Sequence, residues 1–143
     1  MAHGEPPKNV DARLMRCHTL DEELASAGSI KLVKMDVEGS ELSILKGAKN
    51  ILKKGKVKYW VVEYCAPELH RMGGDLNSLR DYMAGFGLEM FVLDYSGCFP
   101  KHFPRSVLTH GKYLQNLLFA DLDCLGSDWV ADDVTLLVSG ETV

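Results

Sequence analysis

Apolar and polar residues follow one another along the chain with two spacings, one typical of strands and one typical of helices. Apolar runs of strand length predict strands at residues 30–35, 57–64, 88–93 and 114–122. Apolar residues at helical spacing predict helices between the first three strands, at about residues 41–54 and 76–86. Strands that alternate with helices are typical of βαβ units in a parallel sheet. We therefore expect an α/β fold of parallel strands with flanking helices.

Two strands of this pattern carry further expectations. Residues 30–35 show little polar alternation, which predicts a strand covered on both faces. Residues 114–122 follow a long connection, and we expect them to form an antiparallel last strand at or beside the sheet edge. The connection, residues 95–113, is rich in Pro, Gly and His, and loops of such length are usually functional or disordered.

The two ends of the chain have weaker patterns. Residues 1–9 contain Pro6-Pro7 and predict a loose leader, and residues 10–17 predict a short strand. Thr19 and Glu22 fit a capping box, which predicts a short helix to about residue 27. Residues 10–121 then form the body of the protein. Residues 122–143 form an acidic extension, in which residues 134–138 are either one more strand or a tail segment.

Composition narrows the class of protein. The chain has 143 residues, which suggests one domain. Its net charge of -4 does not indicate a nucleic-acid-binding surface, which would be strongly basic. No apolar run approaches the ~20 residues that a membrane helix needs, so we expect no membrane span. The four cysteines form no CxxC pair, which favours free thiols in a reducing compartment. With no apolar N-terminal signal region, we expect a cytoplasmic protein.

The first confident strand ends in a cluster of acids. Residues 36–41, Asp-Val-Glu-Gly-Ser-Glu, follow it directly, and the first helical pattern begins behind them. Glu63 closes the next predicted strand, which is otherwise apolar. Ligands of open α/β sheets bind at the carboxyl ends of the strands. We therefore expect Asp36, Glu38 and Glu63 to meet at one end of the sheet, with Gly39 permitting an unusual backbone angle in the turn.

A set of short motifs resembles the FkbM-type methyltransferases over roughly residues 10–121. In chain order the motifs are Thr19-Leu20-Asp21, Lys34-Met35-Asp36-Val37-Glu38-Gly39-Ser40-Glu41, Leu45-Lys46-Gly47-Ala48, Val61-Val62-Glu63 and Asn116-Leu117-Leu118-Phe119. The acidic motif, with its spacing to Leu-Lys-Gly-Ala, is the most specific of them. The resemblance implies a partial Rossmann-like sheet and O-methyl transfer from S-adenosylmethionine to a hydroxyl of a small-molecule, sugar or lipid-like acceptor. It also implies that the four predicted strands match strands four to seven of the family's sheet.

One part of the family pattern has no counterpart in this sequence. The family's first strands carry a glycine-rich turn for the cofactor, whereas Gly4 is followed by Glu5-Pro6-Pro7 and no strand–glycine–helix unit. The chain thus resembles the C-terminal half of such an enzyme, and its cofactor-binding residues stay unknown. The alternative is a catalytically inactive, truncated methyltransferase-like domain that acts through protein association. Its open sheet edge would then invite self-association or a partner chain.

The resemblance gives the acids of residues 36–41 candidate roles. Methyl transfer to a hydroxyl needs the oxygen held in line and a group that takes up its proton. We expect Asp36 to face the reacting hydroxyl as a catalytic base, with Glu38 assisting. Carboxylates at a strand end could equally hold a cation, and Asp36 could simply bond loop amides. Glu41 is a candidate substrate contact, or else it stabilises the N-terminus of the following helix.

Two further residues near this end of the sheet have open interpretations. Glu63 would lie in the same crevice as a catalytic carboxyl, or it would pair with a nearby cation such as Arg71. His70 lies on an expected loop and is a candidate substrate contact, although a lone loop histidine is more often solvated.

Two groups outside the acidic cluster also carry alternatives. The long connection contains histidines and aromatics that suit either a substrate lid or a satellite cluster packed on the sheet: Phe99, His102, Phe103, His110 and Tyr113. Six lysines suit either a phosphate-binding stripe or a solvated helix face with its exit loop: Lys46, Lys49, Lys53, Lys54, Lys56 and Lys58.

Overall fold

The computed structural model describes residues 14–93, 100–105 and 114–128, and the predicted leader lies outside them. Its elements are α1 (Leu20–Glu23), β1 (Ile30–Met35), α2 (Glu41–Lys46), α3 (Lys49–Lys53), β2 (Val57–Cys65), α4 (Ala66–Arg71), α5 (Leu76–Ala84), β3 (Glu89–Leu93), β4 (Lys101–Phe103), β5 (Leu114–Ala120) and α6 (Leu122–Asp128). The α/β class predicted from the sequence is therefore confirmed. No helix of the described residues is long and apolar enough to cross a membrane.

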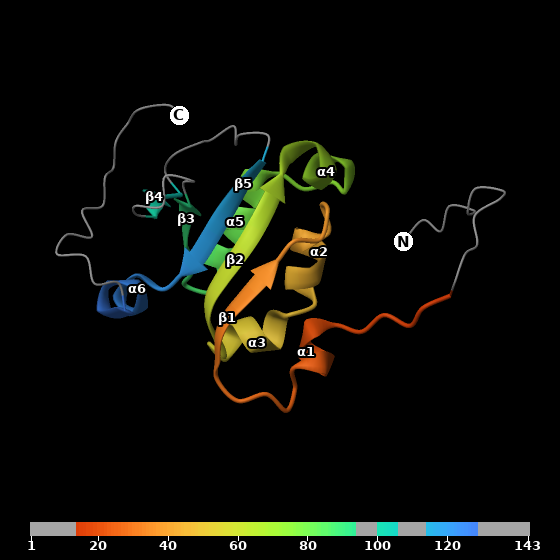
Figure 1. Cartoon of the computed structure of the whole chain (residues 1–143), viewed down its shortest axis with the longest axis horizontal. Coiled ribbons are helices and arrows are strands. Elements are labelled where there is room, and N and C mark those ends of the chain that lie inside the picture. The colour runs from red at the N-terminus through yellow and green to blue at the C-terminus, as the bar shows by residue number, and fades with distance from the viewer. Residues whose placement is uncertain (1–13, 94–99, 106–113, 129–143) are drawn as a thin grey trace.

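The strands form one mixed sheet in the order β1-β2-β5-β3-β4 (Figure 1). β1 and β2 are parallel, and every other neighbouring pair is antiparallel. The antiparallel direction of β5 is confirmed, but its expected place at or beside the edge is wrong. β5 lies in the centre, between β2 and β3, because its apolar residues Leu117, Leu118 and Phe119 are buried on both faces.

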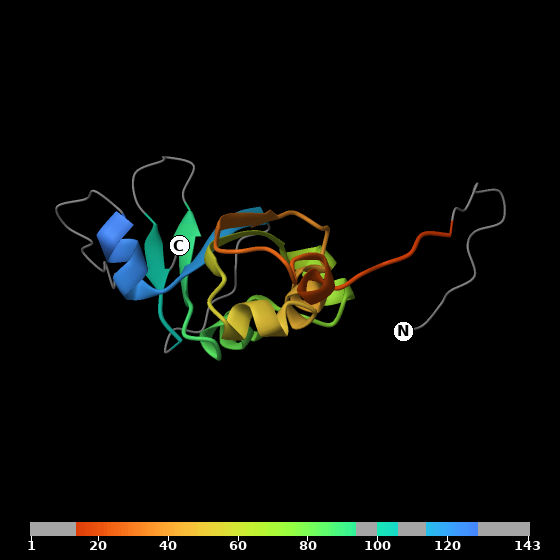
Figure 2. The same cartoon turned by 90° about the horizontal axis from the view of Figure 1, so that it is seen from below.

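The two faces of the sheet have different covers. Helices α2, α3, α4 and α5 supply the main core together with the sheet residues Trp60, Val62 and Leu117. Figure 2 shows these helices gathered on one side of the sheet. A smaller cluster on the opposite face contains Tyr59 and Phe91, covered by Leu125 of α6. Because side chains alternate between the faces of a strand, this division fixes which strand residues face the helices.

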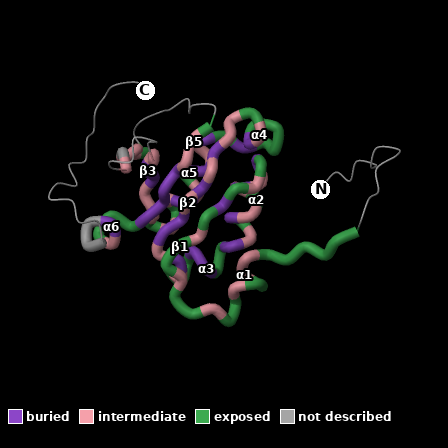
Figure 3. The backbone as a smooth tube through the Cα atoms, viewed as in Figure 1, coloured by how far each residue is buried: buried purple, intermediate pink, exposed green. Residues whose placement is uncertain are grey.

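β1 is an edge strand, so the expectation that it is covered on both faces is wrong. Leu32 is 51% exposed, and Lys31 and Lys34 are exposed as well. Figure 3 shows this contrast between β1 and the buried strands β2 and β5. Only Val33 and Met35 contribute to the main core from the end of the strand nearest the acidic motif. The outer edge of β1 is paired by no strand of the described residues.

The single helix expected at residues 41–54 is broken into α2 and α3 at Gly47. Asp21 explains the break, because it binds both sides of it. Its backbone N–H donates to the Gly47 carbonyl at 3.0 Å, and its carboxylate accepts from the N–H groups of Asn50 and Ile51, each at 2.9 Å. Asp21 therefore caps the N-terminus of α3 from a distant part of the chain, while Thr19 caps α1 in the expected capping box.

We predict that Asp21→Ala lowers the free energy of unfolding by about 1–2 kcal/mol, because two helix N–H groups lose their acceptor. Asp21→Asn retains one accepting oxygen and should lose less. Glu23→Ala changes an exposed acid of the same helix and should cost less than ~0.5 kcal/mol. Urea unfolding of the variants measures these differences. Equal midpoints for Asp21→Ala and Glu23→Ala would contradict the capping role.

Three other elements differ from the sequence expectations. α1 ends at Glu23 rather than near residue 27, and residues 14–17 form no regular structure where a strand was expected. α6 occupies the start of the acidic extension. α4 replaces an expected loop, because Pro67 lies in its first turn, where proline is favoured. Residues 134–138 lie outside the described residues.

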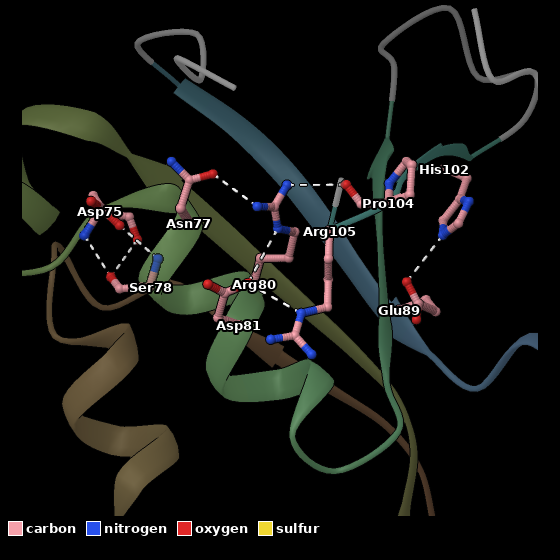
Figure 4. Close-up of polar contacts among 9 residues, drawn as sticks. All are labelled: Asp75, Asn77, Ser78, Arg80, Asp81, Glu89, His102, Pro104 and Arg105. Carbon is pink, nitrogen blue, oxygen red and sulfur yellow. Dashed lines mark hydrogen bonds and ion pairs between the residues drawn. The ribbon is translucent and has the colours of Figure 1, made fainter. Parts of the chain in front are cut away.

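The connection between β3 and β5 is anchored to α5. That helix begins with a capping box, in which the Asp75 carboxylate accepts the Ser78 N–H at 2.6 Å and this bond lowers the pKa of Asp75. Arg80, only 3% exposed, donates to the Pro104 carbonyl at 3.2 Å and to Asn77 Oδ1 at 3.1 Å (Figure 4). A buried guanidinium thus ties the segment after β4 to the helix.

The described part of this connection packs on the sheet. His102 Nε2 lies 3.1 Å from Glu89 Oε2, across the β3–β4 pair (Figure 4). The His102 ring lies 5.0 Å from the Phe91 ring, and Phe103 packs against the main core. These contacts favour the satellite cluster over the lid for His102 and Phe103. The other three members of that group, Phe99, His110 and Tyr113, lie outside the described residues.

Candidate functional site

The acidic motif forms a tight turn at the carboxyl end of β1. Ser40 donates its N–H to the Val37 carbonyl at 3.2 Å, and the two residues between them have positive φ angles, 53° at Glu38 and 94° at Gly39. A side chain at Gly39 would place its Cβ 2.5 Å from the backbone oxygen of Glu68 in α4. The expected role of Gly39 in the backbone angle is confirmed, and its close approach to α4 adds a second reason for glycine.

Glu41 holds this turn from inside the protein. The residue begins α2 and is only 2% exposed, and its Oε1 accepts the Gly39 N–H at 3.1 Å. Its Oε2 is buried without a hydrogen-bond partner. Burying a carboxylate destabilises the folded state unless its oxygens are hydrogen-bonded. Glu41 therefore fixes the turn at a cost in stability. Its expected contact with substrate stays a prediction.

Asp36 and Glu63 are neighbours at the ends of the parallel strands. The β1–β2 register pairs Met35 with Val62, which places the next residues, Asp36 and Glu63, side by side. A hydrogen bond between the two carboxyls raises the pKa of Glu63, and burial and the Asp36 charge raise it further. The Lys34 ammonium, 4.0 Å from Asp36 Oδ2, acts in the opposite direction on Glu63. The two carboxyls therefore lie close enough to interact, and Glu63 is the one whose pKa is raised.

Two further predicted site residues are surface residues of the motif turn and of α4. Glu38 is exposed, and its charge also raises the pKa of Glu63, so it lies within electrostatic reach. His70 is exposed in the last turn of α4 rather than on a loop. Arg71 pairs with Glu68 of the same helix, its Nε donating at 3.0 Å. The nearby cation whose charge acts on Glu63 is Lys34.

Asn116 is a site residue that the sequence analysis did not single out. It lies on β5 directly opposite Glu63, and its own face of the strand carries Leu118, which belongs to the cluster opposite the main helices. Its Oδ1 is buried without a hydrogen-bond partner. The signal in the sequence was an amide within an otherwise largely apolar strand. We call Asp36, Glu63 and Asn116 the polar strip, because they follow one another across three neighbouring strands.

The predicted lysine stripe does not act as one unit. Lys56 donates to the carbonyls of Ala25, at 3.0 Å, and Ala27, at 2.8 Å, and so anchors the loop before β1. Lys58 lies 5.7 Å from the centre of the Tyr59 ring. The helix lysines are exposed, which favours the solvated face: Lys46, Lys49, Lys53 and Lys54.

Two features that could hold a metal ion or a phosphate are absent from the described residues at the ends of β1 and β2. No group of three or more His, Cys, Asp and Glu side chains is arranged to hold a metal ion in the described ranges. The turn after β1 is filled by α4 at Gly39, and β2 runs directly into α4 at Ala66. Neither strand end of the parallel pair therefore provides a glycine-rich cradle for phosphates or a nucleoside.

We predict that Glu63→Gln changes how stability depends on pH. Because the pKa of Glu63 is raised in the folded state, the Glu63 carboxyl contributes to the free energy of unfolding in acid. This contribution is lost as pH rises through the folded-state pKa. The variant should match the wild type in acid and be more stable at neutral pH. Thermal unfolding at several pH values in low salt measures the effect, with exposed Asp123→Asn as the control. A constant difference at all pH values would contradict the raised pKa of Glu63.

Comparison with known proteins gives one match. The model of the methyltransferase FkbM domain matches residues 2–90, which include the acidic turn, Asp36, Glu63 and α5. The match ends within β3, so β4, β5 and Asn116 lie beyond it. No curated protein and no solved structure matches the chain.

Proposed function

The chain belongs to the FkbM methyltransferase family, and we propose that it carries the acceptor side of an S-adenosylmethionine-dependent O-methyltransferase. The acceptor would be a hydroxyl of a small-molecule, sugar or lipid-like compound. The observation that carries the proposal is the Asp36–Glu63 carboxyl pair, which the strand register places side by side at the carboxyl ends of two parallel strands. The pKa of Glu63 in this pair is raised. Ligands of α/β sheets bind at this end, and perturbed carboxyls gather at functional sites.

In this proposal Asp36 is the general base. Its side chain is 52% exposed, so an acceptor hydroxyl can reach it. Glu63 retains its proton to higher pH than an ordinary glutamate and donates it to Asp36, which holds the Asp36 carboxylate in one orientation. Lys34 supports the negative charge of Asp36 from 4.0 Å. When the acceptor hydroxyl replaces the bond from Glu63, Asp36 can take its proton as the oxygen becomes nucleophilic.

The other predicted residues have supporting roles in the proposal. Glu38 adds negative charge beside the pair and assists Asp36. Glu41 acts through the turn that it holds, and His70 at the end of α4 would touch the more distant part of the acceptor. S-adenosylmethionine would supply the methyl group. Because the described residues provide no glycine-rich cradle, the proposal assigns the cofactor no contacts.

Two measurements on the full chain test the proposal. The chain is titrated with S-adenosylmethionine by calorimetry, and it is incubated with methyl-labelled S-adenosylmethionine and a panel of alcohols, sugars and hydroxylated lipids. Binding at micromolar cofactor with label transferred to a hydroxyl is the expected result. Neither heat nor transfer at millimolar cofactor would refute a catalytic role for this chain.

A second candidate function, protein association, is favoured by the edge of β1. That edge is unpaired by the described residues, and Leu32 on it is 51% exposed. Upstream, Leu14 is 101% and Met15 76% exposed, on a segment that runs away from the sheet in Figures 1 and 2. An open edge with exposed apolar residues favours pairing with another strand.

We predict that association through this edge makes the mass of the wild type concentration-dependent in light scattering after gel filtration. Leu32→Lys places a charge at the centre of the edge and should return the chain to a monomer. Met72→Lys changes an apolar residue that is 56% exposed at the C-terminal end of α4 and serves as the control. A wild type that stays monomeric at all concentrations would exclude a second copy as the partner.

A further inference from the structure

The polar strip crosses three strands on the face opposite the main helices. Val61 belongs to the cluster on that face, so Glu63, two residues further along β2, faces the same way. Asn116 stands opposite Glu63 in the β2–β5 register, and Leu118 places it on the same face. Asp36 directly follows Met35, and the β1–β2 register pairs Met35 with Val62, so Asp36 lies beside Glu63. Neighbouring strands lie about 4.8 Å apart, so the strip is roughly 10 Å long.

Asn116 lacks the partner that a buried amide normally has. Its Oδ1 is buried and accepts no hydrogen bond, and a buried oxygen without a donor destabilises the folded state. The residue as a whole is partly exposed, so a ligand at the surface can reach part of it. An amide held by no internal bond at its oxygen can turn about χ2 and offer that oxygen to a ligand. The missing partner is therefore a hydrogen-bond donor.

The chemistry of the strip indicates the class of ligand. The oxygens of Asp36, Glu63 and Asn116 can each accept a hydrogen bond, and the Asn116 amide nitrogen can also donate one. A single hydroxyl can satisfy only one end of such a row. Several hydroxyls on one ring, each of which both donates and accepts, can satisfy all three positions. Leu93, opposite Asn116 in the β5–β3 register, adds an apolar neighbour for the C–H groups of a ring.

We propose that Asn116 is an acceptor-binding residue and that the acceptor is a polyhydroxylated ring of the sugar type. Asn116 Oδ1 accepts a hydrogen bond from a second hydroxyl of the ring while the hydroxyl to be methylated lies at Asp36. The assignment rests on the proposed function, and it narrows the acceptor from any hydroxyl compound to a polyol. It also assigns a role to a residue beyond the part that the family model matches.

The test is a binding experiment that needs neither cofactor nor turnover. The isotopically labelled full chain is titrated with methyl glucoside, and with cyclohexanol as the ring that has a single hydroxyl. The side-chain amide signals of Asn116 and the carboxyl signals of Asp36 and Glu63 are followed by NMR. We expect the three residues to shift together with methyl glucoside and the amide of Asn116 to stay unchanged with cyclohexanol. Equal shifts with both compounds, or none with methyl glucoside, would overturn the proposal.

Variants separate binding from folding. Asn116→Leu should weaken methyl glucoside binding about 10-fold, the usual effect of losing one good hydrogen bond. Gln115→Leu, next to it on the same strand, should leave the affinity unchanged. Should Asn116→Leu fail to fold, the amide shift of the wild type still decides the question. Glucoside binding without methyl transfer would refute the proposed function alone, whereas transfer with no effect of Asn116→Leu would refute this inference alone.

Discussion

Replacement of Gly39 by alanine should lower the free energy of unfolding by about 3 kcal/mol or more, which is a large effect for a single substitution. The residue has a φ of 94°, which a side chain disfavours. Its added Cβ would also lie 2.5 Å from the backbone oxygen of Glu68. Backbone atoms of α4 cannot move aside as a flexible side chain would. The turn must open, and Glu41 then loses the N–H that its Oε1 binds.

Two other glycines separate the causes of this effect. Gly55 has a φ of 58° and open space around it, so Gly55→Ala reports the backbone term alone, about 1–2 kcal/mol. Gly28 has neither a positive φ nor a close neighbour, so Gly28→Ala should be neutral or slightly stabilising. Urea unfolding of the three variants measures the series. A Gly39→Ala cost no larger than that of Gly55→Ala would show that α4 yields to the new side chain.

The sequence predicted the elements whose cause is local. The strand at residues 30–35 and the capping box at Thr19 agree with the structure, because an apolar run and a cap depend on neighbouring residues. The break between α2 and α3 could not be predicted in the same way. It depends on Asp21, which reaches across about 30 residues to bind Asn50 and Ile51. Helical spacing alone continues smoothly through Gly47.

Sheet order was the second feature beyond the reach of the pattern. An apolar run does not say which neighbours a strand takes, and β5 returns to the centre only after a long connection. The expectation for β1 was wrong for the same reason. Its apolar residues predicted a strand covered on both faces, but β1 lies at the edge of the sheet. Leu32 shows the outcome, since half of its surface is exposed at the sheet edge.

The candidate site also contains residues that the sequence could place and residues that it could not. Asp36 and Glu63 were expected to meet because carboxyl ends of parallel strands meet, and the register places them side by side. Asn116 could not be expected there, since its position depends on the antiparallel return of β5 between β2 and β3. The burial of Glu41 was also hidden, because a charged residue at the start of a helix normally faces solvent.

Asp36→Asn should reduce methyl transfer by about 100-fold or more, the effect on turnover that we expect to be largest. An amide has nearly the same shape as the carboxylate but cannot take up the proton of the acceptor hydroxyl, and general bases contribute about 100- to 10,000-fold. The fold should not suffer. The variant removes the charge of Asp36, which now raises the pKa of Glu63, so thermal stability at neutral pH should stay equal or rise.

This opposition between activity and stability distinguishes a base from a structural residue. A residue that only held the turn would lose activity and stability together on substitution. Glu68→Gln is the matched control, since Glu68 lies at the same end of the sheet but pairs with Arg71. It should leave the methyl-transfer rate within about twofold, because an exposed ion pair contributes little. Normal turnover by Asp36→Asn would transfer the role of base to Glu63 or Glu38, and the pH profile of Glu63→Gln would then show which carboxyl acts.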